Sequence, residues 1–343
     1  MNLLQRALAD SSLSHAYLLT GPPQIGKMTM ALDLAMALNC SAPETQRPCG
    51  ECTSCLKIKA GKHSDVELIE VLDASQSEDG KSKTEIGTEQ IKKIIHSSFL
   101  PPFEGRHRVY IINDAAQTSL EAANRLLKTL EEHQGQAVFI LLTCNLKSLP
   151  ATVISRCQIL NLSRASVADI ERFLREKWGV DPAKAGLLAR LSHGCPGWAL
   201  DALRNSDLMT QREQELARLR EILSGDYSVR FGAASQLVQQ FARKRDGVYE
   251  ILENWAVWWH DILMAKTGCH DYIVNIDYHT ALVEMAGSYG LAQIKKALQD
   301  LSSAEQQLKL NANPRLALEV LMLNLPAPAA KSSVRMQVGA INA

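Results

Sequence analysis

The chain has 343 residues, a length that predicts two or three domains. Of these residues 46% are hydrophobic and 22% charged, a composition typical of a soluble globular protein. Lys and Arg together number 37, as do Asp and Glu, so the chain has no net charge that would attract it to nucleic acid or acidic lipid. No apolar run reaches the roughly 20 residues of a membrane span, and the N-terminus lacks the features of a secretory signal. We therefore expect a cytoplasmic protein that contacts no membrane.

Five short apolar runs in the first half of the chain predict β-strands. Near-continuous apolar runs are typical of strands buried on both faces of a parallel sheet. They span residues 15–20, 66–71, 108–113, 137–143 and 157–162. Helical patterns lie between them, over residues 28–39, 88–97 and 118–133. The alternation predicts a doubly wound α/β domain that ends near residue 163.

Two details of this first half concern its boundaries. Thr118 and Glu121 have the spacing of a capping box at the start of the third helix. The polar segment 73–87 has the composition of an exposed, mobile loop.

Residues 21–27 have the sequence of a phosphate-binding loop, G-x-x-x-x-G-K, between a predicted strand and a predicted helix. The loop runs from Gly21 to Gly26 and Lys27; the amides around the last two would face the phosphates, and Lys27 would reach the β- and γ-phosphates. The next residue is normally a Ser or Thr that ligates magnesium. Here it is Met28, whose thioether is a poor ligand for that ion. Thr29 would point about 100° further round the helix.

Four cysteines follow the helix of the phosphate loop. Cys40, Cys49, Cys52 and Cys55 have the spacing C-x8-C-x2-C-x2-C, which predicts a tetrahedral, all-thiolate and therefore structural Zn²⁺ site, one per chain. A redox motif is the alternative, although it would use only two of the four. The other cysteines are scattered singly and are predicted to be small buried apolar residues; they are Cys144, Cys157, Cys195 and Cys269.

The third strand should complete the nucleotide site. In an ATP-hydrolysing site such a strand ends in Asp-Glu, whereas here it ends in Asn113 and Asp114. An amide at 113 brings no charge to the metal ion, and Asp114 is shorter than the glutamate that orients water. Two metal-holding positions are degraded together, so we expect no magnesium-dependent hydrolysis. Whether the loop still binds ATP stays open, and an active ATPase with variant residues is the alternative.

Polar residues also follow the fourth strand. Thr143 and Asn145 lie where a side chain could sense a γ-phosphate. Ser155, Arg156 and Cys157 precede the fifth strand. Arg156 is either an ordinary surface arginine or an arginine finger for a neighbouring site, a role that is worth roughly 10³–10⁵ in rate.

The second half of the chain is predicted to be helical. Bounded helices cover residues 166–179 and 181–194, and helical patterns continue from 207 to about 325. One face of a long helix carries Ile251, Trp255, Trp258, Trp259, Ile262 and Leu263. We interpret this stripe as helix-bundle core or subunit contact. Residues 326–343 have the composition of a loose tail.

Four features together resemble a known family. The stretch HAYLLTGPPQIGK, the four-cysteine insert, AANRLLKTLEE and ISRC resemble the bacterial clamp-loader AAA+ subunits of DNA polymerase III, over residues 1 to about 205. The resemblance implies a RecA-like AAA+ domain over 1–163 with a zinc module at 40–55, a helical lid over 164–206 and a helical collar over 207–325. The collar agrees with the family only in size and class.

The resemblance also implies a function. In this family the gamma or tau subunits hydrolyse ATP, while another subunit is a stator without hydrolysis. Arg156 matches the arginine of the SRC motif, which completes the ATP site of an adjacent subunit. The implied partners are gamma/tau and delta subunits in a hetero-pentamer, the sliding clamp, and primer–template DNA through the assembly.

Several residues depart from the ATP-hydrolysing members. Gly197 and Trp198 stand where those members carry a sensor arginine, and His133 replaces a proline that is common in the family. With Met28 and Asn113, these departures favour the stator. A gamma-type ATPase motor and a zinc-dependent DNA-binding module are the alternatives.

Overall fold

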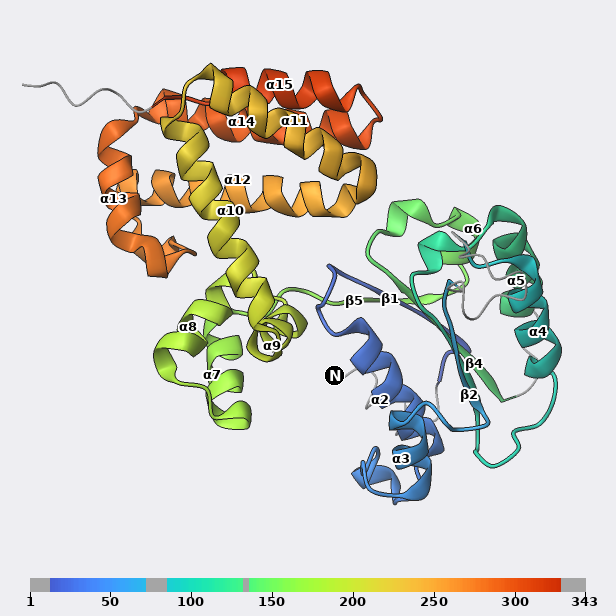
Figure 1. The fold of residues 1–343 in the computed structure, drawn as a ribbon. Coiled ribbons are helices and arrows are strands. Elements are labelled where there is room, and N and C mark those ends of the chain that lie inside the picture. Colours follow the sequence, from blue (N-terminus) through green and yellow to red (C-terminus); the bar gives the residue numbers. More distant parts are fainter. Residues whose placement is uncertain (1–12, 72–84, 132–135, 328–343) are drawn as a thin grey trace, which may run out of the picture. The chain divides into compact units, whose positions relative to one another are not determined.

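The structure, a computed structural model, describes residues 13–71, 85–131 and 136–327 (Figure 1). Most of the predicted polar loop, His133 and nearly all of the predicted tail lie outside these residues. The chain separates into two compact units. Unit 1 contains the chain up to Ser166 together with Gly194–Trp198, and unit 2 contains Val167–His193 and the chain from Ala199 onward.

Unit 1 is built on a five-stranded parallel sheet. Its strands are β1 (Ala16–Thr20), β2 (Val66–Ile69), β3 (Arg108–Ile112), β4 (Ala137–Thr143) and β5 (Gln158–Asn161), in the order β2-β3-β4-β1-β5. In register, Thr20 lies opposite Thr143 of β4 and Asn161 of β5. The five predicted strands are confirmed, and because all pairs are parallel their carboxyl ends meet at one edge of the sheet.

Helices cover both faces of this sheet (Figure 1). Tyr17 and Leu19 of β1 pack into an apolar cluster with α2 (Lys27–Asn39) and α3 (Thr53–Lys59). Ala16 and Leu18 pack into a second cluster, with α4 (Thr88–Ser98) and α5 (Leu120–Glu131). Successive strand residues point to opposite faces, so a continuous apolar run serves both layers. The predicted doubly wound domain is confirmed.

The start of α5 differs from the prediction. The backbone N–H of Thr118 donates to Ala115 O (3.2 Å) and so closes the short helix η2 (Ala115–Gln117). It is Ser119 that caps α5, because its Oγ accepts from the N–H of Ala122 at 3.3 Å. The predicted capping box from Thr118 to Glu121 is therefore wrong, because the cap is Ser119 and the residue three positions on is Ala122, which cannot complete the box.

Short elements complete unit 1. They are η1 (Glu44–Gln46), η3 (Leu146–Ser148) and α6 (Ala151–Ile154).

Unit 2 contains only helices among its described residues. They are α7 (Val167–Trp178), α8 (Pro182–Leu191), α9 (Pro196–Arg204, whose first residues belong to unit 1), α10 (Ser206–Ser224), α11 (Tyr227–Arg243), α12 (Arg245–Thr267), η4 (His270–Tyr272), η5 (Ile276–Tyr278), α13 (His279–Ser288), α14 (Leu291–Lys309) and α15 (Pro314–Asn324). None of the helices in the described ranges is both long and apolar enough to span a bilayer.

The tryptophan stripe lies on α12 inside the helical core. Trp255, Trp258 and Trp259 are all 0% exposed and belong to one cluster with residues of α10 to α15. Trp258 meets the Tyr278 ring edge-on at 5.5 Å, and Trp259 meets the Tyr289 ring at 5.0 Å between centroids. Of the two interpretations of the stripe, helix-bundle core is the one that the structure supports.

Candidate metal centre and nucleotide site

The phosphate-binding loop joins β1 to α2 at the carboxyl edge of the sheet. Gly21 has φ +153°, and its N–H donates to Thr143 O at 3.3 Å. A Cβ on Gly21 would lie 2.6 Å from Leu162 O, so only glycine fits there. Gly26, at φ +104°, precedes the first residue of α2. The loop therefore has the strand–loop–helix setting that the sequence predicts.

Lys27 has three partners within the protein. Its Nζ donates to Gly21 O and to Pro22 O, both at 2.7 Å, and to Cys144 Sγ at 3.3 Å. The ammonium group is thus held by the loop and by the end of β4.

The burial of the scattered cysteines differs from the prediction that all four are buried. Of the four scattered cysteines, Cys195 is buried and Cys157 is half-buried, whereas Cys144 and Cys269 are exposed. Cys144 is exposed because it follows the last residue of β4, at the open edge of the sheet, and Cys269 follows the end of α12. The prediction that both are buried was wrong.

The two residues after Lys27 offer no oxygen where the motif needs one. Met28 is half-buried and packs against the apolar cluster between α2 and the sheet. Thr29 is exposed on α2. The position that normally ligates magnesium is filled by a side chain that contributes to packing.

Asn113 and Asp114 lie at the same edge of the sheet, directly after β3. The Asn113 amide donates through Nδ2 to Glu70 Oε1 at 2.8 Å. Asp114 has φ +47° and starts η2, and its Oδ2 accepts from Gln117 Nε2 at 2.7 Å. Asn113 is thus engaged by a residue just after β2, and Asp114 by a residue of η2.

Thr143 and Asn145 are bonded within their own turn. Thr143 Oγ1 donates to Asn145 O at 3.1 Å, and Asn145 Oδ1 accepts from the N–H of Lys147 at 3.0 Å. These contacts shape the turn after β4.

A second segment of unit 1 closes on the phosphate loop. The N–H of Gly197 donates to Gln24 O at 2.9 Å. A Cβ on Gly197 would lie 2.6 Å from that oxygen, so a side chain there would displace the loop. Sequence reasoning singled out Gly197 as a departure from the family but missed this contact; its only local signal is a glycine second in a helix.

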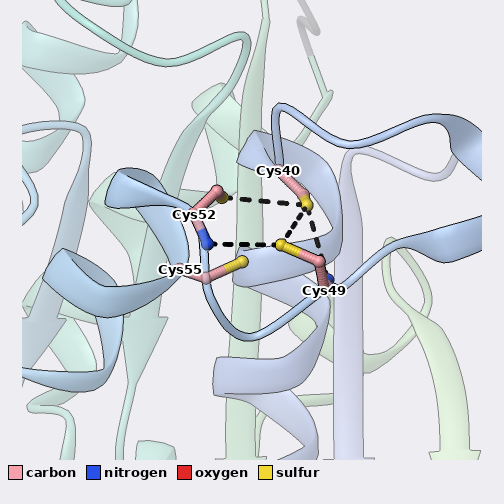
Figure 2. A group of neighbouring side chains, drawn as sticks. All are labelled: Cys40, Cys49, Cys52 and Cys55. Carbon is pink, nitrogen blue, oxygen red and sulfur yellow. Dashed lines mark hydrogen bonds between the residues drawn. The ribbon is translucent and has the colours of Figure 1, made fainter.

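The four predicted metal ligands converge between α2 and α3 (Figure 2). Their sulfur atoms all lie within 4.8 Å of one another, with Cys40 Sγ 3.5 Å from Cys49 Sγ and 3.9 Å from Cys52 Sγ. A tetrahedral ion with Zn–S bonds of about 2.3 Å separates its sulfurs by about 3.8 Å. The four cysteines can therefore hold one metal ion.

Backbone N–H groups point at these sulfurs. Cys40 Sγ accepts from Ala42 and Cys49, and Cys49 Sγ accepts from Cys52. Hydrogen bonds, foremost from the N–H of Cys55, lower the pKa of Cys52 to about 5, whereas burial raises the pKa of Cys55 to about 12. Since a metal ligand must be a thiolate, metal binding at this site would release protons.

Arg156 lies just after α6 and is anchored to its own unit. Its Nη1 donates to Thr152 O at 2.8 Å and to Ser155 Oγ at 3.2 Å, and its Nη2 forms an ion pair with Glu131 at the end of α5. Sequence reasoning missed Glu131, because a contact over 25 residues leaves no mark in a helical pattern.

Comparison with known proteins adds the family. A family model described as DNA polymerase III, delta subunit, matches residues 1–166, and a model of the C-terminal part of that subunit matches residues 206–326. A DNA polymerase III gamma subunit-related protein of Thermotoga maritima superimposes with a TM-score of 0.45 at 18% identity, covering 94% of this chain and 98% of that one.

Several relatives align with nearly the whole chain, among them two from Bacillus subtilis. DNA polymerase III subunit tau of Bacillus subtilis is 26% identical over 94% of this chain, which spans only 59% of tau's length. Subunit delta′ of the same organism is 28% identical, over 95% of this chain and 94% of the relative. The two family models of the delta subunit together match most of the residues of this chain. The chain therefore belongs to the DNA polymerase III delta subunit family.

Proposed function

We propose that this chain is a delta-prime-type clamp-loader subunit of DNA polymerase III, a stator that helps to load the sliding clamp onto primed DNA without hydrolysing ATP itself. The observation that carries the proposal is a phosphate loop with its fold intact but with Met28 in place of the magnesium ligand. Asn113 adds no charge at the end of β3. Without a bound metal ion, the charge that develops on transferred phosphate is not neutralised.

Two further contacts support a phosphate loop that does not hydrolyse ATP. Lys27 is already bonded to two loop carbonyls, and Gly197 closes on Gln24 of the same loop. A phosphate that reached Lys27 would have to replace its bonds to the two loop carbonyls.

The proposed metal is zinc, in a structural role. Four thiolates fill its tetrahedral coordination, and no position is left for a substrate water. Cys40 follows α2, while Cys52 and Cys55 lie at the start of α3, so the ion would join the ends of the two helices.

The proposed contribution to catalysis is Arg156, acting in trans. It would complete the ATP site of an adjacent gamma- or tau-type subunit in a cytoplasmic hetero-pentamer with delta. In this assignment residues 1–163 are the AAA+ domain, 164–206 the lid and 207–325 the collar that joins the subunits.

A gamma- or tau-type ATPase is the second candidate. The tau relative is 26% identical over 94% of this chain, close to the 28% of the delta′ relative, so overall identity does not separate the two roles. The residues at the nucleotide site favour the stator.

The test is the steady-state ATPase activity, with and without clamp and primed DNA, of a loader reconstituted from this chain and its gamma-type and delta partners. We expect no turnover by this chain alone. Arg156→Ala should lower turnover at the adjoining ATP site by roughly 10³-fold or more, and so markedly lower the activity of the loader by that site's share, while gel filtration shows normal assembly.

Lys27→Ala is the matched control for the chain's own site, and it should leave the activity of the loader unchanged. Turnover by the isolated chain that disappears in Lys27→Ala would instead identify a motor subunit.

A further inference from the structure

The guanidinium group of Arg156 is docked, meaning that it is bound to residues on the surface of its own unit. Its side chain is 31% exposed, and all of its terminal nitrogens have acceptors within unit 1. Nη1 is held by Thr152 O and Ser155 Oγ, which lie next to it in the chain, and Nη2 by the carboxylate of Glu131. In this position the two terminal nitrogens of Arg156 are both engaged by its own unit.

One of the three guanidinium nitrogens of Arg156 has no hydrogen-bond acceptor among the described residues. This nitrogen is Nε, and it is buried. A buried donor without an acceptor is unfavourable, and a phosphate offers three charged oxygens where Glu131 offers one oxygen contact. The docked guanidinium can therefore be captured by a stronger anion.

Glu131 is the only charged partner in this arrangement among the described residues, and it comes from a different element. The carboxylate is half exposed and stands on the last residue of α5, whereas Thr152 and Ser155 belong to α6 and its end. Removing its charge would weaken the docking of Arg156 but leave the turn around Ser155 intact.

We propose that Glu131 is a positioning residue that holds Arg156 docked in the free chain and releases it to the nucleotide of the neighbouring subunit in the assembled loader. This inference rests on the proposed trans role of Arg156. The pair would make the finger available only when a neighbouring phosphate competes for it, and would thus keep hydrolysis low before the clamp and DNA are in place.

The first test uses the chain by itself. Arginine-specific dicarbonyl labelling, read residue by residue by mass spectrometry, should modify Arg156 about two- to fivefold faster in Glu131→Gln than in the wild type, the range expected for a partly exposed ion pair. Glu121→Gln is the matched control, because Glu121 pairs with Arg125 on the same helix. It should not change labelling of Arg156. An unchanged rate in Glu131→Gln would overturn the proposal.

The second test uses the reconstituted loader. Glu131→Gln should raise the unstimulated ATPase activity about two- to fivefold and leave the clamp- and DNA-stimulated activity unchanged, so that the stimulation ratio falls. Glu121→Gln should change neither. If Glu131→Gln lowers both activities as Arg156→Ala does, Glu131 supports the engaged finger and the docking proposal is wrong. If Arg156→Ala has no effect in an intact loader, the trans role itself fails.

Discussion

At the scale of single residues, two buried polar side chains organise the loop before β3. Asp65 accepts from the N–H groups of Phe103, Glu104 and Gly105 at 2.7–2.8 Å. Asn39 Oδ1 accepts from the next two N–H groups, at 2.8 and 3.0 Å. Five consecutive amides are thus bonded to two side chains. Burial raises the pKa of Asp65, but these donors and Arg108 outweigh it and hold the pKa below its usual range.

Asp65→Asn should lower the free energy of unfolding by about 1–3 kcal/mol, because an amide nitrogen would face backbone donors. The pKa of Asp65 is lower in the folded state than in the unfolded state, where it is about 3.9. The stabilisation is therefore fully present above about pH 5 and is lost as the pH falls through the folded-state pKa. Urea unfolding across this range should show the gap between wild type and variant closing in acid.

Asp169→Asn is a suitable control, since this carboxylate is 55% exposed. It should change stability by no more than about 0.5 kcal/mol. A gap for Asp65→Asn that stays constant down to about pH 3 would contradict the assigned direction of the pKa shift.

At the scale of elements, the cysteine cluster lies where the end of α2 meets the start of α3, two helices that also pack in one apolar cluster. Between Cys40 and Cys52 the chain forms only the three-residue helix η1 and turns. Gly50, at φ +76°, makes the turn that brings Cys49 to the other cysteines. A bound ion would therefore determine where α3 begins.

Purified chain should contain about one zinc per molecule by elemental analysis, and Cys52→Ser should lose it. Without the ion the segment from Cys40 to α3 should exchange its amide hydrogens faster, and soluble yield should fall. Cys269→Ser, which changes an exposed cysteine outside the cluster, should keep both the metal and the yield. A metal-free wild-type preparation with full protection of α3 would refute the structural role.

Some elements could be predicted from the sequence and others could not. The fully buried β4 (Ala137–Thr143) was predicted to the residue, because its apolar run is unbroken, and the cysteine cluster was predicted from local spacing. The start of α5 was misplaced, since η2 uses Thr118 first. Contacts between distant side chains, such as Arg156 with Glu131, could not be predicted, because hydrophobic periodicity contains no information about partners.

At the scale of the whole molecule, the apolar cores are separate. The cluster that contains the tryptophan stripe lies within unit 2, and the two clusters on the faces of the sheet lie within unit 1. Four of the five tryptophans, Trp178, Trp255, Trp258 and Trp259, belong to unit 2. Cores that share no residues can unfold in separate cooperative steps.

Trp259→Ala should therefore lower the stability of unit 2 by about 3–5 kcal/mol and leave the unfolding transition of unit 1 in place. Calorimetry should resolve the two transitions, and tryptophan fluorescence should follow the one that shifts. Trp178→Ala, at a 43% exposed position, should move it far less. A single transition that shifts as a whole would show that the two units unfold together.

The contact between Gly197 and Gln24 bears on how easily a chain of the proposed stator type could gain a working ATP site. Restoring a hydroxyl at position 28 and a carboxylate at position 113 would repair the metal ligands, but the resemblance places a sensor arginine at the position of Gly197 or Trp198. A side chain at 197 would lie 2.6 Å from a loop carbonyl, so an arginine at 197, unlike one at 198, needs α9 to shift first. Under the proposed function, single substitutions could have silenced such a site one at a time, whereas restoring an arginine at 197 would need a backbone rearrangement as well. A stator of this design would therefore lose hydrolysis more easily than it could regain it.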